Sequence, residues 1–309
     1  MAIDSLAIYN NLVEMNQSNP EAYFYRANYC INTGNLVQAQ SDLESALDLD
    51  STVAKVRIKY ADLRVAQLDL EGGKYHYEYV LSKDSTSVGA LMGLGRIYAI
   101  LKNNAAAIHY LSLLLEKDPH YAEAYFLKGM IYRADFYETG RQESWDRAMS
   151  SYQTAVEQNS DYYSAYVEMG VMHDQVGSDL AMDYYNSALA IYPESIEAWY
   201  NIGMFFQERG EIDTALATYR TLNLIDSTYA DAYYNQGYIH LIFTKHIDSA
   251  AFYFSRATNF DPEYFQAYNN LGLCYEELGD KNAARNNYQK AVDINPDFQL
   301  AKDNLNRLK

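Results

Sequence analysis

One stretch restricts the fold more than any other, because its small, aromatic and proline residues recur at the same offsets upstream. It is Ala267–Pro296, AYNNLGLCYEELGDKNAARNNYQKAVDINP. Gly272 and Ala284 fall where the two helices of a hairpin would cross closely. Gly279 stands where a first helix would end in a positive φ, and Pro296 would stop the second helix. The large residues that would fill the space around the crossing are Tyr268, Leu271, Tyr275 and Tyr288. The stretch therefore predicts a helix–turn–helix unit.

The same spacing predicts eight such units over residues 20–298. Leu68 takes the place of the turn glycine in the second unit, and Thr244 takes it in the seventh, which also has one extra residue. The fourth unit contains about seven extra residues around Phe136–Ser144, which either lengthen its helices or form a loop. Insertions in repeats tend to fall on one face, so a binding role for this insertion stays open beside a purely structural one.

The two ends predict further helices. Residues 1–17 have the apolar spacing of an amphipathic helix and match the end of a unit's second helix without its first. We therefore expect the sequence to begin inside a longer chain. Residues 299–309, QLAKDNLNRLK, predict a capping helix with a polar, solvent-exposed outer face. The expected organisation is one domain over residues 1–309, with a partial repeat at 1–19, eight repeats at 20–298 and the cap at 299–309.

This pattern resembles an array of tetratricopeptide repeats (TPR) of the bacterial type. The repeat signature, W-x2-L-G-x2-Y…A-x3-F…P over about 34 residues, matches the spacing of the opening stretch. The resemblance covers essentially the whole chain. It implies an all-α fold, a right-handed superhelix or α-solenoid of helix pairs.

The composition limits the classes of partner that the chain could bind. The net charge of −17 argues against nucleic acids and anionic membranes, which need clusters of Lys and Arg, and it allows basic or neutral proteins. Acidity for solubility alone explains the charge equally well. The two cysteines, Cys30 and Cys274, are too far apart along a stiff array to pair. With no leader pattern and no long apolar run, the cytoplasm is the default location, and an anchored cell-envelope protein stays open if a leader was removed.

The sequence shows no catalytic, metal-binding or phosphate-binding motif, so we expect neither an enzyme nor a cofactor. Of the six histidines, His173 and His240 occupy positions where other repeats have tyrosine. They are therefore expected to be packing residues. His240 and His246 are six residues apart, which places them on different faces of one helix or on two helices.

The resemblance implies a ligand surface on the first helices of successive repeats, which in this family line a concave groove. Counting the repeat's aromatic residue as position 4, the family turns positions 2, 5, 6, 9, 12 and 13 inward. In the last three repeats, position 6 is always asparagine, and an evenly spaced row of amides could hydrogen-bond a peptide backbone. An asparagine retained only for solubility is equally compatible with the pattern. The predicted contact residues are Asn201, Asn235 and Asn270 with Tyr200, Tyr234, Asn269, Met204 and Tyr238.

Two functions of different classes follow. The first is a scaffold or adaptor that binds a peptide or partner helix in the groove, with no nucleic acid and no direct membrane insertion. The alternative is a structural or self-associating segment of a larger cell-envelope assembly. The Lys and Asn pattern by which chaperone-binding TPR domains clamp a terminal carboxylate is missing: their first lysine position holds Phe24. The end of the groove nearer the N-terminus is expected to be more apolar, because its position 5 residues are Phe24, Ile58, Met92 and Phe126.

Overall fold

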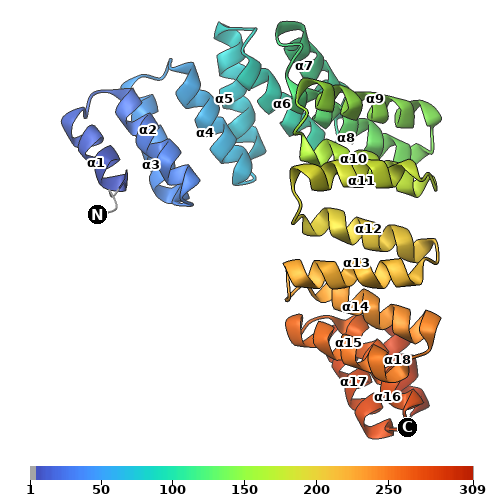
Figure 1. The fold of residues 1–309 in the computed structure, drawn as a ribbon. Helices are drawn as coiled ribbons and strands as arrows, with labels where there is room; N and C mark the ends of the chain where they lie inside the picture. The colour runs from blue at the N-terminus through green and yellow to red at the C-terminus, as the bar shows by residue number, and fades with distance from the viewer. Residues whose placement is uncertain (1–4, 309) are drawn as a thin grey trace. The chain divides into compact units, whose positions relative to one another are not determined.

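The computed structural model describes residues 5–308, and over these residues every regular element is a helix (Figure 1). Eight consecutive helix pairs follow α1 (Ser5–Met15) and precede α18 (Gln299–Arg307), which confirms the all-α array of paired helices. Residues 1–4 and Lys309, which the predicted terminal helices include, lie outside the described residues. The chain divides into two compact units, residues 1–165 (unit 1) and 166–309 (unit 2), at a boundary inside α10 (Tyr163–Gln175). One continuous domain stays a prediction.

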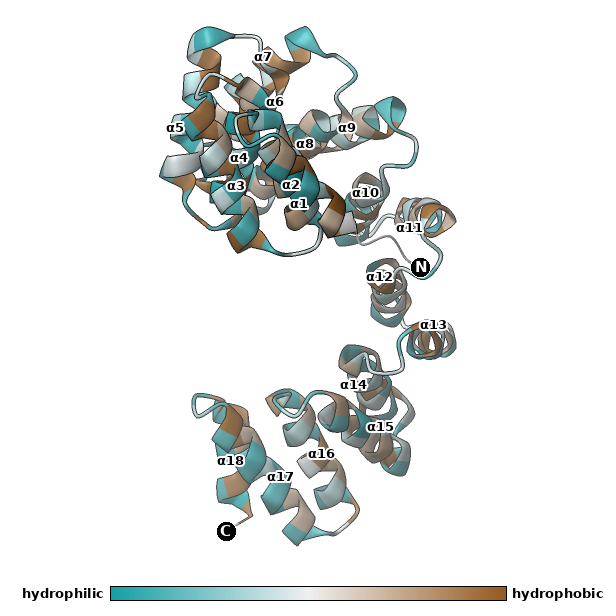
Figure 2. Cartoon of the chain, turned by 90° about the vertical axis from the view of Figure 1, so that its left-hand side faces the viewer, coloured by the Kyte–Doolittle hydropathy of each residue, from teal (hydrophilic) through white to brown (hydrophobic). Residues whose placement is uncertain are grey.

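Each pair consists of a first and a second helix that are adjacent in sequence. The remaining helices of unit 1 are α2 (Pro20–Asn32), α3 (Leu36–Leu49), α4 (Ala54–Ala66), α5 (Leu70–Lys83), α6 (Val88–Ile100), α7 (Asn104–Lys117), α8 (Ala122–Thr139) and α9 (Gln142–Gln158). Those of unit 2 are α11 (Leu180–Ile191), α12 (Ile196–Glu208), α13 (Ile212–Ile225), α14 (Ala230–Ile239), the π-helix η1 (His240–Thr244), α15 (Ile247–Phe260), α16 (Phe265–Glu277) and α17 (Lys281–Ile294). Hydrophobic and hydrophilic residues share the same helices, as amphipathic packing requires (Figure 2).

A glycine on the first helix packs against an aromatic ring on the second in most pairs. A Cβ added to Gly272 would lie 2.7 Å from the ring of Tyr288 and 3.1 Å from the carbonyl oxygen of Ala284. This confirms the close crossing that the spacing predicted. The same contact joins Gly129 to Tyr152, Gly170 to Tyr185, Gly203 to Tyr219 and Gly237 to Phe254. The helices can approach only because the first one carries no side chain at this point.

The turns between paired helices use a left-handed residue. Gly279 has φ +83°, as predicted, and Leu68 has φ +66° in place of glycine. The prediction for Thr244 is wrong, because the left-handed residue is Lys245 at φ +57°. The extra residue of this repeat widens the end of the first helix into the π-helix η1, which moves the turn one position along the chain.

Leu68 offers a simple test of this turn. We expect Leu68→Gly to raise the free energy of unfolding by about 0.5–1 kcal/mol, because glycine removes the left-handed strain but loses more entropy on folding. Leu68 is 85% exposed, so little packing is lost. Urea denaturation measures the change. Leu224→Gly is the control, since Leu224 is equally exposed but helical and should lose up to about 1 kcal/mol. A loss of stability in Leu68→Gly would contradict the strain.

The insertion of the fourth repeat lengthens its helices. α8 has 18 residues against 13 in α2, α4 and α6, and α9 has 17 against 14 in α3, α5 and α7. The connection between α8 and α9 is short, with Gly140 left-handed at φ +67°. Of the two alternatives that the sequence left open, the structure therefore has longer helices and no bulging loop.

The last helix caps unit 2. Arg307 of α18 forms an ion pair with Glu276 of α16 at 2.8 Å, and the Asn304 amide donates to Asn269 Oδ1 at 2.9 Å. Ala301 is the buried contact of α18, whereas Leu300 stays 54% exposed. The helix therefore covers the end of the array with a mostly polar outer surface, as the sequence predicted.

Candidate functional site

The eight predicted contact residues lie on α12, α14 and α16, the first helices of three successive repeats in unit 2. We call the face formed by these eight residues the ladder surface. Asn235 and Asn269 are buried, with 7% and 2% of their surface exposed. The half-buried members are Tyr200, Asn201, Met204, Tyr234, Tyr238 and Asn270. The surface is therefore partly covered.

Side chains of neighbouring repeats meet on the ladder surface. The Asn235 amide nitrogen lies 3.7 Å from Met204 Sδ and donates to the Tyr219 hydroxyl at 3.3 Å. One repeat further along, the Asn270 amide donates to the Tyr234 hydroxyl at 3.2 Å. These contacts link α12 to α14 and α14 to α16. The residues that the repeat spacing selected therefore form one connected surface across three repeats.

The three asparagines at position 6, which are Asn201, Asn235 and Asn270, differ in the hydrogen bonds that their side-chain amides form. The side chain of Asn201 forms no hydrogen bond to any residue between 5 and 308, so its amide is open to a ligand. Asn235 is tied to the core through Tyr219. Asn270 donates to Tyr234 and accepts a bond of 3.2 Å from Asn269. Asn269 is itself covered by the capping helix through Asn304, which leaves Asn201 as the most accessible donor and acceptor.

An aromatic stack between repeats accounts for the tyrosines at position 5. Tyr234 stacks on Tyr264, the residue before α16, with ring centroids 4.9 Å apart, and Tyr200 meets Tyr229, the residue before α14, at 6.0 Å. Burial raises the pKa of Tyr229 to about 12, with the nearby Asp231 carboxylate adding to the shift. Tyr264 donates a hydrogen bond of 2.7 Å to Asp231, and burial raises its pKa. The two predicted contact tyrosines therefore also hold neighbouring repeats together.

His173 and His240 are packing residues, as predicted. His173 is 8% exposed and stacks on Tyr184 at 5.2 Å, and His240 is equally buried and stacks on Tyr253 at 5.4 Å. Burial lowers the pKa of both imidazoles, which favours their neutral form. His240 belongs to η1, whereas His246 lies in the turn directly before α15, so the prediction that both histidines lie on helices is wrong. Their ring centroids are 6.0 Å apart.

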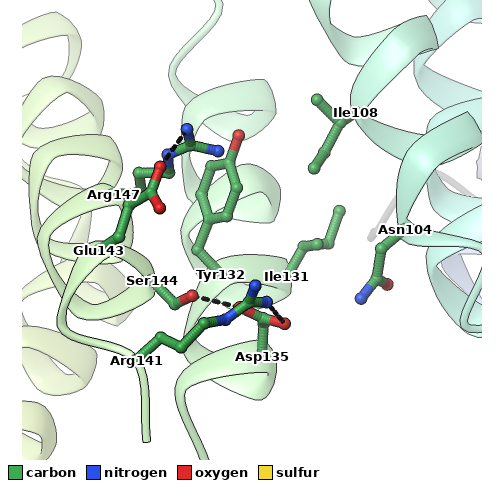
Figure 3. Close-up of a pocket in the computed structure, with 9 residues that line it drawn as sticks. All are labelled: Asn104, Ile108, Ile131, Tyr132, Asp135, Arg141, Glu143, Ser144 and Arg147. Atoms are coloured by element: carbon green, nitrogen blue, oxygen red, sulfur yellow. Dashed lines mark hydrogen bonds and ion pairs between the residues drawn. The ribbon is translucent and has the colours of Figure 1, made fainter. Parts of the chain in front are cut away.

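The lengthened α8 and α9 are held together around a small hollow of about 170 Å³ (Figure 3). Arg141 donates to both carboxylate oxygens of Asp135, at 2.6 and 2.8 Å, and Ser144 donates to the same carboxylate. The Ser144 hydrogen bond and then Arg141 lower the pKa of Asp135. Arg147 forms a separate ion pair of 2.6 Å with Glu143. The contacts of Arg141 and Ser144 with Asp135 fix the short turn between the two longer helices.

A larger hollow of about 560 Å³ opens between α6 and α8 in unit 1. We call it the α6–α8 hollow. Most of its lining comes from the positions that the family turns inward: Arg96, Ala99 and Ile100 of α6 and Leu127, Met130, Arg133 and Ala134 of α8. These residues were not among the predicted contacts, although they occupy the same inward-facing positions of the repeat. Their signal was the combination of apolar and basic residues at positions 9, 12 and 13.

Within residues 5–308 no group of three or more His, Cys, Asp or Glu side chains is arranged to hold a metal ion. Over the same residues no helix combines the length and the apolar character that crossing a membrane requires.

Comparison with protein families agrees with the repeat pattern. Models described as "Tetratricopeptide repeat" match residues 60–122, 184–217, 230–264 and 265–298, which together make up more than half of the chain. The stacked helix pairs and their surfaces define a repeat scaffold of the protein-interaction class. The chain belongs to the tetratricopeptide repeat family.

Curated relatives share only parts of their length with this chain. "BBSome complex member BBS4" of Mus musculus is 31% identical over 42% of this chain and 25% of that protein. The Bos taurus protein of the same name is 25% identical over 64% of this chain and 37% of that protein. "Anaphase-promoting complex subunit 3" of Schizosaccharomyces pombe is 20% identical over 65% and 29%. The chain thus spans less than two fifths of these relatives. They are eukaryotic, so the bacterial type of array stays a prediction.

A solved structure confirms the fold over nearly the whole chain. "Crystal structure of APC/C hetero-tetramer Cut9-Hcn1" matches with a TM-score of 0.55 at 16% identity, over 97% of this chain and 58% of that one. At this identity the match bears on the fold alone. The repeat family and the relatives indicate a protein-interaction scaffold.

Proposed function

We propose that the ladder surface of unit 2 binds an extended peptide or a helix of a partner protein, and that the chain is a non-catalytic adaptor without a cofactor. One observation carries the proposal. Amide and aromatic side chains of three successive repeats form a connected, half-exposed surface through the Asn235–Met204 and Asn270–Tyr234 contacts. A ligand that runs along the repeats would meet polar and apolar groups in alternation.

The residues of this surface suit a partner bound mainly through its backbone. Asn201 offers both a donor and an acceptor that no residue between 5 and 308 occupies. Met204 and Tyr238, half-buried on neighbouring helices, supply adaptable apolar contact area. The names of the relatives place those proteins in multi-protein complexes. That context supports the same kind of role for this chain.

The test compares the protein with its Asn201→Ala, Asn270→Ala double variant. Each lost hydrogen bond costs about 0.5–1.5 kcal/mol, so partner binding should weaken about tenfold or more. Asn235 is left unchanged, because removing its bond to the buried Tyr219 would also destabilise the core. The measurement is affinity capture from source-cell lysate with quantitative mass spectrometry, followed by titration of the captured partner.

The matched control is Asn259→Ala, Asn286→Ala, since both asparagines are exposed on the second helices α15 and α17. The proposal requires one partner that the parent and the control retain and the double variant loses. Equal capture by all three proteins would contradict it. Concentration-dependent self-association with no captured partner would favour the structural alternative instead.

A further inference from the structure

We propose that the α6–α8 hollow of unit 1 is a second docking site, and that it takes an acidic amphipathic segment of a partner protein. The apolar side chains of this segment would enter the hollow, and its carboxylates would meet the cations around it. The site goes beyond the function proposed for unit 2, because it contains none of the ladder residues. Either proposal can therefore fail alone.

The floor of the hollow is apolar and partly open. Ile131 lies at its base with only 5% of its surface exposed, and Leu127 is half-buried beside it. Ile100, the last residue of α6, is 57% exposed, and Met130 of α8 is 36% exposed. Both are large apolar side chains, and both line this one hollow. Clustered exposed apolar groups of this kind mark interaction surfaces more often than scattered ones do.

The charge around the floor is opposite to that of the chain. Arg96, Lys102 and Arg133 line the hollow, and Glu138 is its one carboxylate. The whole chain, in contrast, has 24 Lys and Arg against 41 Asp and Glu. At physiological salt, exposed charges beyond about 8 Å are largely screened, so the local cations decide the sign that a ligand meets. This charge complementarity selects an acidic occupant over a basic one.

The three cations are held differently. Arg96 forms an ion pair with Glu123, which fixes its guanidinium at the edge of the hollow. Arg133 lies over the ring of Tyr137, 5.6 Å from its centroid, and Tyr137 belongs to the part of α8 that the insertion adds. Lys102 is exposed and forms no ion pair with any residue of the described chain. It is therefore the cation best placed to meet a partner's carboxylate.

The size of the hollow suits side chains better than a whole domain. Its volume of about 560 Å³ falls within the range of ligand pockets, roughly 300–1,000 Å³. Leucine-type side chains at i, i+3, i+4 and i+7 on one helix would present a matching apolar stripe, with acidic residues on both sides of it. A helix-in-groove contact of this kind anchors a few side chains and leaves the remainder solvated.

The experiment uses the full chain and a fluorescein-labelled amphipathic peptide of about 14 residues, with leucine at the i, i+3, i+4 and i+7 positions and glutamate elsewhere. A second peptide carries lysine in place of every glutamate. Fluorescence anisotropy at physiological salt should show the acidic peptide binding at least about tenfold more tightly than the basic one. The expected order is notable because the chain's net charge of −17 alone would favour the basic peptide.

Two variants test the floor and the charge separately. Met130→Asp places a carboxylate in the floor, and Lys102→Glu reverses the unpaired cation; each should weaken the acidic peptide about tenfold or more. Leu224→Asp controls for an exposed apolar residue outside the hollow. Lys245→Glu controls for the charge, since Lys245 has nearly the same left-handed backbone as Lys102, with φ +57° against +54°. Circular dichroism confirms that all four variants fold.

Several outcomes would overturn the proposal. These are equal binding of the acidic and basic peptides, no binding of the acidic peptide, or loss of binding in the two controls. Light scattering adds one more: a dimer of the parent chain that Met130→Asp separates would show that a second copy fills the hollow. Support requires a monomeric parent and loss of the acidic peptide in Met130→Asp and Lys102→Glu alone.

Discussion

Gly203→Val is expected to lower the free energy of unfolding by about 3 kcal/mol, the upper part of the range for overpacking. A Cβ at this position would lie 2.4 Å from Cε1 of Tyr219 and 2.8 Å from its Cζ. The ring has no room to withdraw, because Tyr219 is fully buried and its hydroxyl is bonded to Asn235 and Gln207. Urea denaturation followed by circular dichroism measures the loss.

The control is Gly89→Val, also a glycine in a first helix. Its nearest neighbour would be Cδ1 of Ile58 at 3.2 Å, the end of a flexible side chain that can turn away. Combining Gly203→Val with Tyr219→Ala should cost less than the sum of the single changes by about 0.5–3 kcal/mol, because the double variant has no clash. Strict additivity would show that the crossing of α12 and α13 does not depend on this contact.

The crossing could be predicted from sequence because the hairpin is a local object. Glycine and ring are separated by 16 residues in both the Gly203–Tyr219 and the Gly272–Tyr288 pair, a distance that two helices of standard length and a short turn determine. The same logic predicted Leu68 as a left-handed turn residue. It failed at Thr244 because a single extra residue can be absorbed within a helix, as η1 shows, and spacing alone does not say where.

The state of the ladder surface could not be predicted in the same way. Position 6 in the repeat indicates which face of the helix an asparagine is on. Whether the donor and the acceptor of its side chain are free depends on neighbouring residues from other repeats. Asn235 is bonded to Tyr219 of the preceding repeat, and Asn269 is bonded to Asn304 of the capping helix. Such pairings need the distance between helices, which the spacing of one repeat does not contain.

Some signals were present in the sequence and were not used. The tripeptide Asp-Ser-Thr occurs at 50–52, 84–86 and 226–228, each time between a second helix and the next first helix. In each copy the aspartate accepts hydrogen bonds from the threonine two residues later, which lowers the aspartate pKa. This is the Asx-turn chemistry that ends one repeat and starts another. A search for repeated tripeptides would have marked these junctions.

Arg26→Met is expected to cost about 3 kcal/mol of stability, because it leaves a buried carboxylate without its cation, with the Gln38 amide still donating to it at 3.0 Å. Asp42 on α3 is only 1% exposed. Arg26 on α2 donates to both of its oxygens, at 2.9 and 2.7 Å, and this bond is the main reason that the Arg26 pKa is raised. Arg26 also donates to Asn10 of α1 at 3.0 Å, so the variant should loosen α1 as well. Urea denaturation gives the cost, and hydrogen exchange locates it.

The double variant Arg26→Met, Asp42→Leu separates the burial of a lone charge from the loss of packing. Replacing both members of a buried ion pair by apolar residues is often nearly neutral, so its stability should return to within about 1 kcal/mol of the parent. Lys55→Met is the control for an exposed pair, because Lys55 and Glu21 keep 43% and 51% of their side chains exposed, so solvent screens the pair and its loss should change the stability little. If the double variant were as unstable as Arg26→Met, the cost would come from packing around the arginine. If it recovers, the unpaired carboxylate of Asp42 is the cause, and apolar contacts such as those of Cys30 and Leu43 hold α2 against α3 without the ion pair.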